Sequence, residues 1–256
     1  MLNLQPLRLL SVHAHPDDEA SKGAATVAKY VAEGIDVMIA TCTGGERGDV
    51  LNPKLKNEEV KEKLAEIRKQ EMAKSIEILG AKHTWLGFID SGYPEGDPKP
   101  ALPEGCFADI SIEEAAKPLI KLIREFKPQV VITYDENGGY PHPDHIRTHE
   151  ITMFAYEHSG RRNDFPELGE PWQIYKVYYQ KGFNFSQMMA IDNAFKELEK
   201  TNPYAEWMVD MEDDSDLITT KIDCAKYFEK RDEALKAHAT QVDPDGDWVC
   251  FAHRNN

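Results

Sequence analysis

The sequence of 256 residues contains no block of basic residues and no long apolar run. Acidic residues outnumber basic ones by 45 to 30, which gives a formal net charge of −15 at pH 7. Nucleic acids and anionic membrane surfaces attract proteins through clustered Lys and Arg, so this composition argues against both as partners. The N-terminal region also lacks the basic start and apolar core of a signal peptide, and no stretch is long enough to span a bilayer.

Cysteine is scarce, and its positions exclude several kinds of site. Cys42, Cys106, Cys224 and Cys250 are scattered and form no CxxC pair, so we expect free thiols in the cytoplasm. No GxSxG string occurs and no cysteine has an evident base partner, which argues against a covalent nucleophile. The glycine-rich string TGGERGD at 43–49 lacks the lysine of a phosphate-binding loop, and its glutamate would repel phosphate.

Strand-like and helix-like segments alternate through the first half of the chain. Apolar runs predict four strands, at 7–13, 35–43, 83–88 and 129–134. Helical spacing and glycine stops predict three helices, at 24–34, 57–80 and 111–126. This order is typical of an α/β fold with a mostly parallel sheet and helices on both faces.

The last third of the sequence is less regular. We expect a strand at 176–183, a helix at 224–239 and an exposed loop at 159–173. No repeat or linker demands a second domain. We therefore expect a single domain over 1–256, with a core at 1–158 and a C-terminal elaboration at 159–256 that covers the pocket.

Polar segments follow all four predicted strands of the first half. They are 13–19, 43–49, 90–96 and 135–145. In parallel sheets, ligands bind beyond the carboxyl ends of the strands. We therefore expect the four segments to meet at one rim and to form the functional site there.

The string HAHPDDE at 13–19 crowds two histidines and three carboxylates together. The proline favours a turn, and a spacing of three lets His15 and Asp18 point at one place. An imidazole and a carboxylate suit a divalent metal such as Zn²⁺ or Fe²⁺, which usually needs a third protein ligand. A second His-Pro-Asp string supplies His145. The predicted metal ligands are therefore His15, Asp18 and His145.

Residues beside these ligands suggest hydrolytic chemistry. Asp17 adjoins the ligand set without belonging to it and would act as a general base toward water. His142 would protonate a leaving amine or stabilise an oxyanion, with Asp144 orienting its ring. Tyr140 would donate to the same oxyanion.

Other interpretations of the same residues remain open. Each His-Pro-Asp string alone also fits a turn that caps a helix, and only the pair of strings at strand ends favours a metal site. His13 is expected to be structural, and Glu19 to support the helix start or to orient a ligand. His149, four residues after His145, is either a competing ligand or a solvated helix residue. Arg147 has no interpretation at this level.

The strings HPDDE and HPDH resemble the paired motifs of the PIG-L (LmbE-like) superfamily of zinc-dependent de-N-acylases. The resemblance extends over nearly the whole chain. It implies a Rossmann-like fold, acylated amino sugars as substrates, and one divalent metal per chain, Zn²⁺ or alternatively Fe²⁺. It implies the same ligands and base as the residues themselves do, and places His142, Tyr140 and Asp144 near the scissile amide.

Within this superfamily, the strings HAHPDDEASKGAAT, TCTGGERGDVLNP, YDENGGYPHPDHIRTHE and AHATQVDPDGDW are similar to amidases that cleave mycothiol S-conjugates. Such amidases release a mercapturic acid and glucosaminyl-inositol. The resemblance implies a small-molecule partner, an amino-sugar thiol conjugate. It also implies a set of substrate-binding residues, which comprises Lys22, Glu46, Arg68, Asp90, His238 and Gln241.

Two alternatives to this function are kept. A sibling deacetylase, which removes acetate from N-acetylglucosaminyl-inositol in mycothiol biosynthesis or from another N-acyl amino sugar, would share the catalytic residues. Lys22 and the HATQ string at 238–241 are the features expected to separate the two. A carbohydrate-binding protein without turnover should have lost a ligand or the base, and all of these residues are present. The stretch after Asp243 is shorter than the resemblance leads us to expect, which leaves the outer pocket wall undefined.

Overall fold

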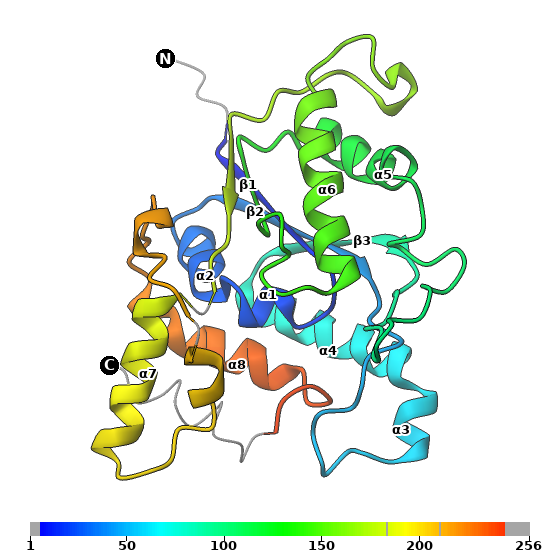
Figure 1. Ribbon diagram of the computed structural model, residues 1–256. Helices are drawn as coiled ribbons and strands as arrows, with labels where there is room; N and C mark the ends of the chain where they lie inside the picture. The colour runs from blue at the N-terminus through cyan, green and yellow to red at the C-terminus, as the bar shows by residue number, and fades with distance from the viewer. Residues whose placement is uncertain (1–5, 183, 210, 244–256) are drawn as a thin grey trace.

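A computed structural model of the chain describes residues 6–182, 184–209 and 211–243 (Figure 1). Five parallel strands form one sheet in the order β3-β2-β1-β4-β5. The strands are β1 (Arg8–His13), β2 (Asp36–Thr43), β3 (Lys82–Phe88), β4 (Val130–Thr133) and β5 (Lys176–Tyr179). The predicted α/β class with a parallel sheet is confirmed.

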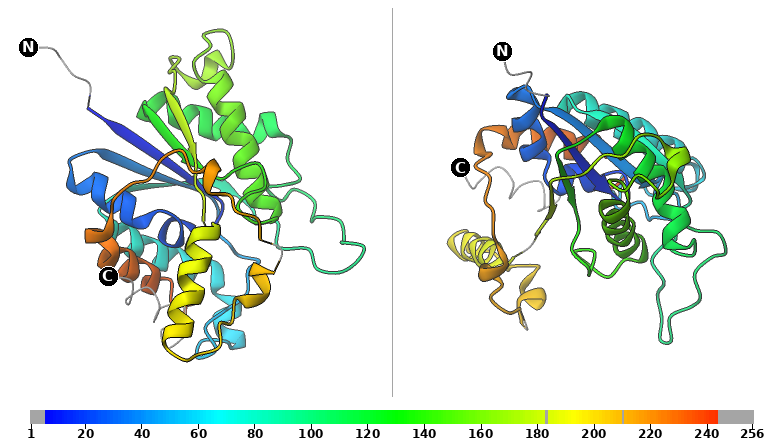
Figure 2. Two further views of the ribbon diagram at one scale, coloured as in Figure 1. Left: turned by 60° about the vertical axis from the view of Figure 1, so that its left-hand side comes forward. Right: turned by 90° about the horizontal axis from the view of Figure 1, so that it is seen from above.

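Helices cover both faces of this sheet (Figure 2). They are α1 (Asp18–Ser21), α2 (Ala24–Ala32), α3 (Glu58–Glu62), α4 (Leu64–Leu79), α5 (Ile112–Phe126), α6 (Pro143–His158), α7 (Phe185–Glu197) and α8 (Phe228–Ala237). Alternate residues of β1 point to opposite faces, as the period of a strand requires. Leu10 and Val12 pack into the cluster under α5 and α6, whereas Leu9 packs with α2, α4 and α8.

The helix predicted over 57–80 is two helices, α3 and α4. The Asn57 side chain accepts from the Val60 N–H at 3.0 Å and caps α3. Lys63 leaves the helical conformation, with φ −102° and ψ 9°. No residue of α3 is buried, whereas α4 buries Leu64, Met72 and Leu79. Apolar spacing did not reveal the break because only the second helix has a core face.

The C-terminal third is more ordered than its sequence suggested. α7 begins with a capping box. The Asn184 side chain accepts from the Gln187 backbone N–H, and the Gln187 side chain accepts from the Asn184 backbone N–H. This signal was present in the sequence and was missed. β5 belongs to the main sheet and α8 packs on α2 and α4, so the predicted boundary at residue 158 does not follow the layers of the fold.

The expected exposed loop at 159–173 is organised by one buried side chain, Arg124 on α5. Its guanidinium donates to the backbone carbonyls of His158, Ser159, Arg161, Asp164, Phe165 and Gly169. A buried charge needs such a set of acceptors. The loop therefore has a defined path, and it includes the short helix η1 (Pro166–Leu168).

The strand order reverses direction between β1 and β4. The chain leaves β1 toward β2 and β3 on one side, and continues from β4 to β5 on the other. Open α/β sheets bind ligands in the crevice at this switch point. The turn into α1 follows β1, and the N-terminal end of α6 lies beside α1 (Figure 1). The two His-Pro-Asp strings therefore meet at this crevice.

None of the helices in the described part of the chain is both long and apolar enough to cross a membrane. Cys42, Cys106 and Cys224 are free thiols, as predicted, and Cys250 lies outside the described residues.

Candidate metal centre

The turn between β1 and α1 brings the first two ligands together. The backbone N–H of His15 donates to Asp18 Oδ2 at 2.9 Å, and His15 Nδ1 lies 3.7 Å from the same oxygen. Asp17 has a left-handed backbone, with φ 97°. This conformation is uncommon for a residue with a side chain and is held here by the surrounding contacts. With this backbone, the Asp18 side chain folds back toward His15, whereas the Asp17 side chain contacts Arg68.

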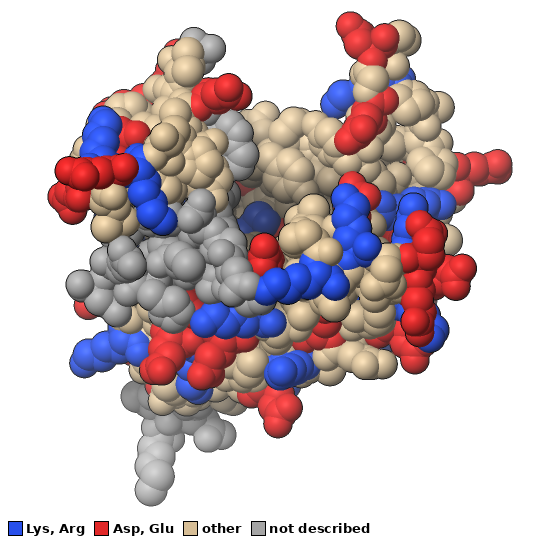
Figure 3. Space-filling model, turned by 90° about the horizontal axis from the view of Figure 1, so that it is seen from below, with Lys and Arg blue, Asp and Glu red and all other residues tan. Residues whose placement is uncertain are grey.

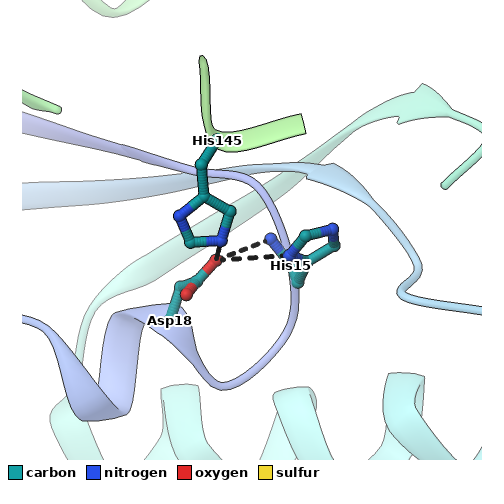
Figure 4. Close-up of side chains that lie close together, drawn as sticks. All are labelled: His15, Asp18 and His145. Carbon is teal, nitrogen blue, oxygen red and sulfur yellow. Dashed lines mark hydrogen bonds and ion pairs between the residues drawn. The ribbon is translucent and has the colours of Figure 1, made fainter. Parts of the chain in front are cut away.

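His145 completes a group of three from the first turn of α6. Its Nε2 lies 3.4 Å from Asp18 Oδ2, and the three side chains point toward one another (Figure 4). One potential ligand atom from each of His15, Asp18 and His145 lies within 4.8 Å of the others. All three residues are buried, with exposed fractions of 8, 2 and 0%. The predicted ligand set is therefore brought together.

The nitrogen that His145 turns into this group fits a metal ligand. His145 Nδ1 contacts the Gly138 carbonyl oxygen at 2.9 Å, so it carries the proton and leaves a lone pair on Nε2. That Nε2 is buried and has no hydrogen-bond partner among the described residues. A buried polar atom without a partner is costly unless something binds it. Two imidazoles and a carboxylate form the donor set that suits Zn²⁺ or Fe²⁺.

The role predicted for Asp144 was wrong in one respect. Its carboxylate does not orient His142, because it lies 3.2 Å from His15 Nε2 instead. The backbone N–H and hydroxyl of Ser91 donate to the same carboxylate. Only the backbone N–H of Asp144 reaches His142 Nδ1, at 3.1 Å. Asp144 thus holds the ring nitrogen of His15 that faces away from the candidate metal position.

A second group of three, His15, His142 and Asp144, also has ligand atoms within 4.8 Å of one another. Unlike the first group, however, it contains no buried side-chain nitrogen or oxygen that lacks a partner among the described residues. His142 Nδ1 accepts a backbone N–H, and the oxygens of Asp144 accept from Ser91. The group around His145 is therefore the better metal position.

The electrostatics of the centre favour a bound cation. Burial alone would lower the pKa of His15, but hydrogen bonds to Asp144 and Asp90 and the charge of Asp18 raise it to about 10. Three buried carboxylates thus surround one imidazole. A cation that replaces the proton on this ring would remain stabilised by the same charges.

Two further side chains hold the ligand Asp18. Tyr134 donates its hydroxyl to Asp18 Oδ2 at 2.8 Å. Lys22 reaches Asp18 Oδ1 at 2.5 Å from one turn along the chain. Sequence reasoning missed Tyr134, the last residue of the predicted strand at 129–134, and Ser91, which lies in the polar segment at 90–96. Lys22 was expected to contact substrate, and its side chain is 24% exposed beside the ligand.

Asp17 is placed beside the ligand group and not in it. Its Oδ2 is 3.0 Å from the Arg68 guanidinium, and its side chain is 24% exposed. Burial raises the pKa of the Asp17 carboxyl above its ordinary value, although the Arg68 guanidinium lowers it. A raised pKa brings a carboxylate closer to the range in which a general base is effective.

His142 and Tyr140 lie against the two histidines of the ligand group. His142 caps α6, and because its Nδ1 accepts a backbone N–H, the neutral ring carries its proton on Nε2. Burial and then the neighbouring His15 and His145 lower the pKa of His142 to about 3. Its ring centroid is 4.6 Å from that of His15. The Tyr140 ring lies 4.5 Å from the His145 ring and is 45% exposed.

The residues predicted to bind substrate fall into two groups. Lys22, Glu46 and Gln241 are partly exposed, and Glu46 Oε1 accepts from the backbone N–H of Asp90 at 3.0 Å. Asp90, Arg68 and His238 are buried to 2, 3 and 0% exposure. Asp90 accepts from the backbone N–H groups of Arg47 and Gly92, and Arg68 donates to the Gly45 and Pro16 carbonyls.

The remaining histidines near the centre have structural contacts. His13 bonds Ser11 Oγ at 2.8 Å, as a structural residue should. His149 bonds the Tyr134 carbonyl at 3.0 Å and belongs to neither group of potential ligands. Arg147, which the sequence left without a role, donates to the Ala108 and Ile110 carbonyls and ties α6 to the loop after β3.

The face of the protein drawn in Figure 3 is hollowed. Seen from below, a basic side chain lies at the bottom of a depression in the surface (Figure 3). A concave site with buried titratable groups is the usual setting for binding and catalysis. In the candidate centre the three potential ligands are buried, whereas the side chains of Asp17 and Lys22 beside them are partly exposed.

Comparison with known proteins gives the class. Residues 10–156 match the PIG-L family, described as GlcNAc-PI de-N-acetylase. The chain belongs to this metal-dependent family of amide hydrolases, and its His15, Asp18 and His145 stand together as a possible metal site.

Individual relatives are consistent with this class. The chain is 54% identical to a mycothiol S-conjugate amidase of Streptomyces coelicolor, over 94% of this chain and 85% of the relative. It is 41% identical to a 1D-myo-inositol 2-acetamido-2-deoxy-alpha-D-glucopyranoside deacetylase of Catenulispora acidiphila, over 92% and 75%. The structure of N,N'-diacetylchitobiose deacetylase from Pyrococcus horikoshii matches with a TM-score of 0.65 at 21% identity, over 96% of this chain and 75% of that one. This last likeness shows the fold.

Proposed function

We propose that this protein is a metal-dependent amidase that cleaves mycothiol S-conjugates in the cytoplasm, releasing a mercapturic acid and glucosaminyl-inositol. The observation that carries the proposal is the 54% identity to a mycothiol S-conjugate amidase, against 41% to a deacetylase. The metal centre alone would serve either reaction. The free thiols of Cys42, Cys106 and Cys224 agree with a reducing compartment.

Zn²⁺ is the metal we propose for His15, Asp18 and His145, with Fe²⁺ as the alternative. When bound, the ion would supply a Lewis acid that polarises an amide carbonyl and makes water more acidic. Three protein ligands leave a coordination position open, as catalytic zinc sites require.

The protein's own groups would move the protons. Asp17 would accept a proton from the attacking water, since its carboxylate is partly exposed and its pKa is raised. With a pKa of about 3, His142 is neutral at neutral pH and presents an N–H on Nε2. We therefore propose that His142 first stabilises the oxyanion, together with the Tyr140 hydroxyl. The proton held by Asp17 would pass to the leaving amine, through His142 or directly.

Substrate recognition would rest on Lys22, Glu46 and Gln241, which are partly exposed. We propose that Arg68 and Asp90 act indirectly. Arg68 joins the base Asp17 to the loop at Gly45, and Asp90 joins His15 to the backbone of Arg47.

A side-by-side assay of metal-reconstituted protein tests the proposal. One reaction contains a fluorophore-tagged mycothiol conjugate and the other N-acetylglucosaminyl-inositol, and free amine is measured in both. Much faster turnover of the conjugate is expected. Preference for the acetylated sugar would assign the protein to the deacetylase alternative, and no turnover of either would refute the proposed amidase and direct the search to other N-acyl amino sugars.

A further inference from the structure

The HATQ string at 238–241 begins with a histidine that contacts α1, the helix that follows the turn at Asp17. His238 follows α8 and is fully buried. Its Nε2 lies 2.6 Å from Glu19 Oε1, and the Ser75 hydroxyl on α4 donates to the same oxygen at 2.6 Å. Burial alone would lower the pKa of His238, but the Glu19 carboxylate raises it above its ordinary value. His238 and Glu19 thus form a buried ion pair between α8 and α1.

The second oxygen of Glu19 holds the backbone of Asp17. Glu19 Oε2 accepts from the Asp17 N–H at 2.9 Å. Asp17 is one of few residues other than glycine in the described chain with a positive φ, and such a conformation persists only where its surroundings fix it. The direction of the Asp17 side chain depends on this backbone. The chain of contacts therefore runs from His238 through Glu19 to Asp17.

The metal ligands are fixed by other groups. Asp18 is held by Tyr134 and Lys22, His15 by Asp144, and His145 by the Gly138 carbonyl. Disturbing His238 should consequently leave the ligands in place.

Thr240, in the same string, is a matched control for His238. The backbone N–H and hydroxyl of Thr240 each donate to the Glu71 carboxylate at 2.7 Å. The Thr240 carbonyl accepts from the backbone N–H groups of Leu51 and Asn52. Thr240 is as buried as His238 and also ties the string to α4, but none of these contacts reaches Asp17.

We propose that His238 is a positioning residue that, through Glu19, fixes the backbone of Asp17 and thereby the direction of the catalytic carboxylate. The inference rests on the proposed function, in which Asp17 is the base. It replaces the expectation that His238 binds substrate, because His238 is fully buried and contacts Glu19 in the protein interior.

The test compares His238→Leu, which removes the donor, with His238→Gln, which retains an N–H, and with Thr240→Val as the matched control. For His238→Leu we expect kcat to fall between about tenfold and a hundredfold, the range for a misplaced catalytic group, with KM and zinc affinity within about twofold of wild type. His238→Gln should restore most of the loss. Thr240→Val should retain kcat even if it unfolds at lower urea.

Hydrogen exchange of the 15–22 segment supplies a readout that needs no substrate. Its amides should exchange faster in His238→Leu and return toward wild type in His238→Gln. Equal kcat losses in His238→Leu and Thr240→Val, or unchanged kcat and exchange in His238→Leu, would overturn the proposal. If His238→Leu fails to fold, Ser75→Ala removes the other donor to the same Glu19 oxygen, and unchanged kcat and exchange there would refute it equally. Wild-type protein inactive on both substrates would refute the proposed function, while the exchange data would still decide the positioning.

Discussion

Two copies of the same tripeptide, His-Pro-Asp, form this centre and use their residues differently. In the first copy, at 15–17, the histidine is a candidate ligand and the aspartate is the partly exposed candidate base. In the second copy, at 142–144, the histidine caps a helix and the aspartate is fully buried against His15. The residue after each tripeptide, Asp18 or His145, points into the ligand group.

The backbone explains this difference. Asp17 has a positive φ, so the chain turns before α1 begins, and the carboxylate of Asp17 contacts Arg68 and is not part of the ligand group. His142 has an extended backbone, and α6 begins directly at Pro143 with Asp144 in its first turn. Asp144 therefore lies on the inner side of a regular helix. Residue type sets what each copy can do, and the local backbone decides which atom meets the metal position.

The largest effect should come from the aspartate of the first copy. Asp17→Asn retains an acceptor for Arg68 and tolerates a left-handed backbone, so the fold should persist. We expect kcat to fall by about 10²–10⁴-fold, the contribution of a general base, with unchanged zinc affinity. Single-turnover assays and a competing chelator measure the two quantities. Turnover close to wild type would remove Asp17 from the mechanism.

Substitution of the aspartate of the second copy, Asp144, should weaken metal binding. Asp144→Asn removes the charge beside His15 Nε2 and retains an acceptor for Ser91. Loss of such a partner typically weakens metal binding by about 10–100-fold. At saturating zinc, most of the activity should return, in contrast to Asp17→Asn. If added zinc failed to restore Asp144→Asn, the assigned division of roles between the two aspartates would be wrong.

The first residues of the two copies, His15 and His142, should differ in protonation state. With pKa values of about 10 for His15 and about 3 for His142, the first is protonated and the second neutral at pH 7 in metal-stripped protein. Zinc must then displace one proton, so its apparent affinity should rise about tenfold per pH unit from about pH 6 to about pH 8. Calorimetry in buffers of different ionisation enthalpy counts the proton. An affinity independent of pH would contradict this assignment.

The raised pKa of His15 also has a defined effect on the stability of metal-stripped protein. The stabilisation is fully present below the ordinary value of 6.5 and is lost as pH rises through about 10. Urea unfolding across this range, with His15→Gln as the reference, measures it.

Much of the centre could be predicted from sequence because its ligands follow strands whose order the apolar pattern revealed. His15, Asp18 and His145 needed only that order and the rule for parallel sheets. The partner of Asp144 could not be predicted, because Ser91 and His15 reach it from two other segments of the chain. His238 was misplaced for a similar reason. Its distance in sequence from Glu19 gives no sign of whether it faces the pocket or the interior.

The smallest expected effect concerns the residue four positions after each candidate ligand, Lys22 after Asp18 and His149 after His145. Lys22 contacts Asp18 and is partly exposed, whereas His149 bonds the Tyr134 carbonyl. Lys22→Ser should therefore lower kcat/KM for the mycothiol conjugate more than for N-acetylglucosaminyl-inositol, by about fivefold or less, since one partly exposed charged contact contributes about 1 kcal/mol at most. Both substrates are assayed at saturating zinc, because removing the ammonium also changes the charge on Asp18. Lys29→Ser, whose ammonium donates to the Asp223 carbonyl, serves as the control. Equal losses on the two substrates would show that Lys22 supports the ligand Asp18 and does not select the substrate.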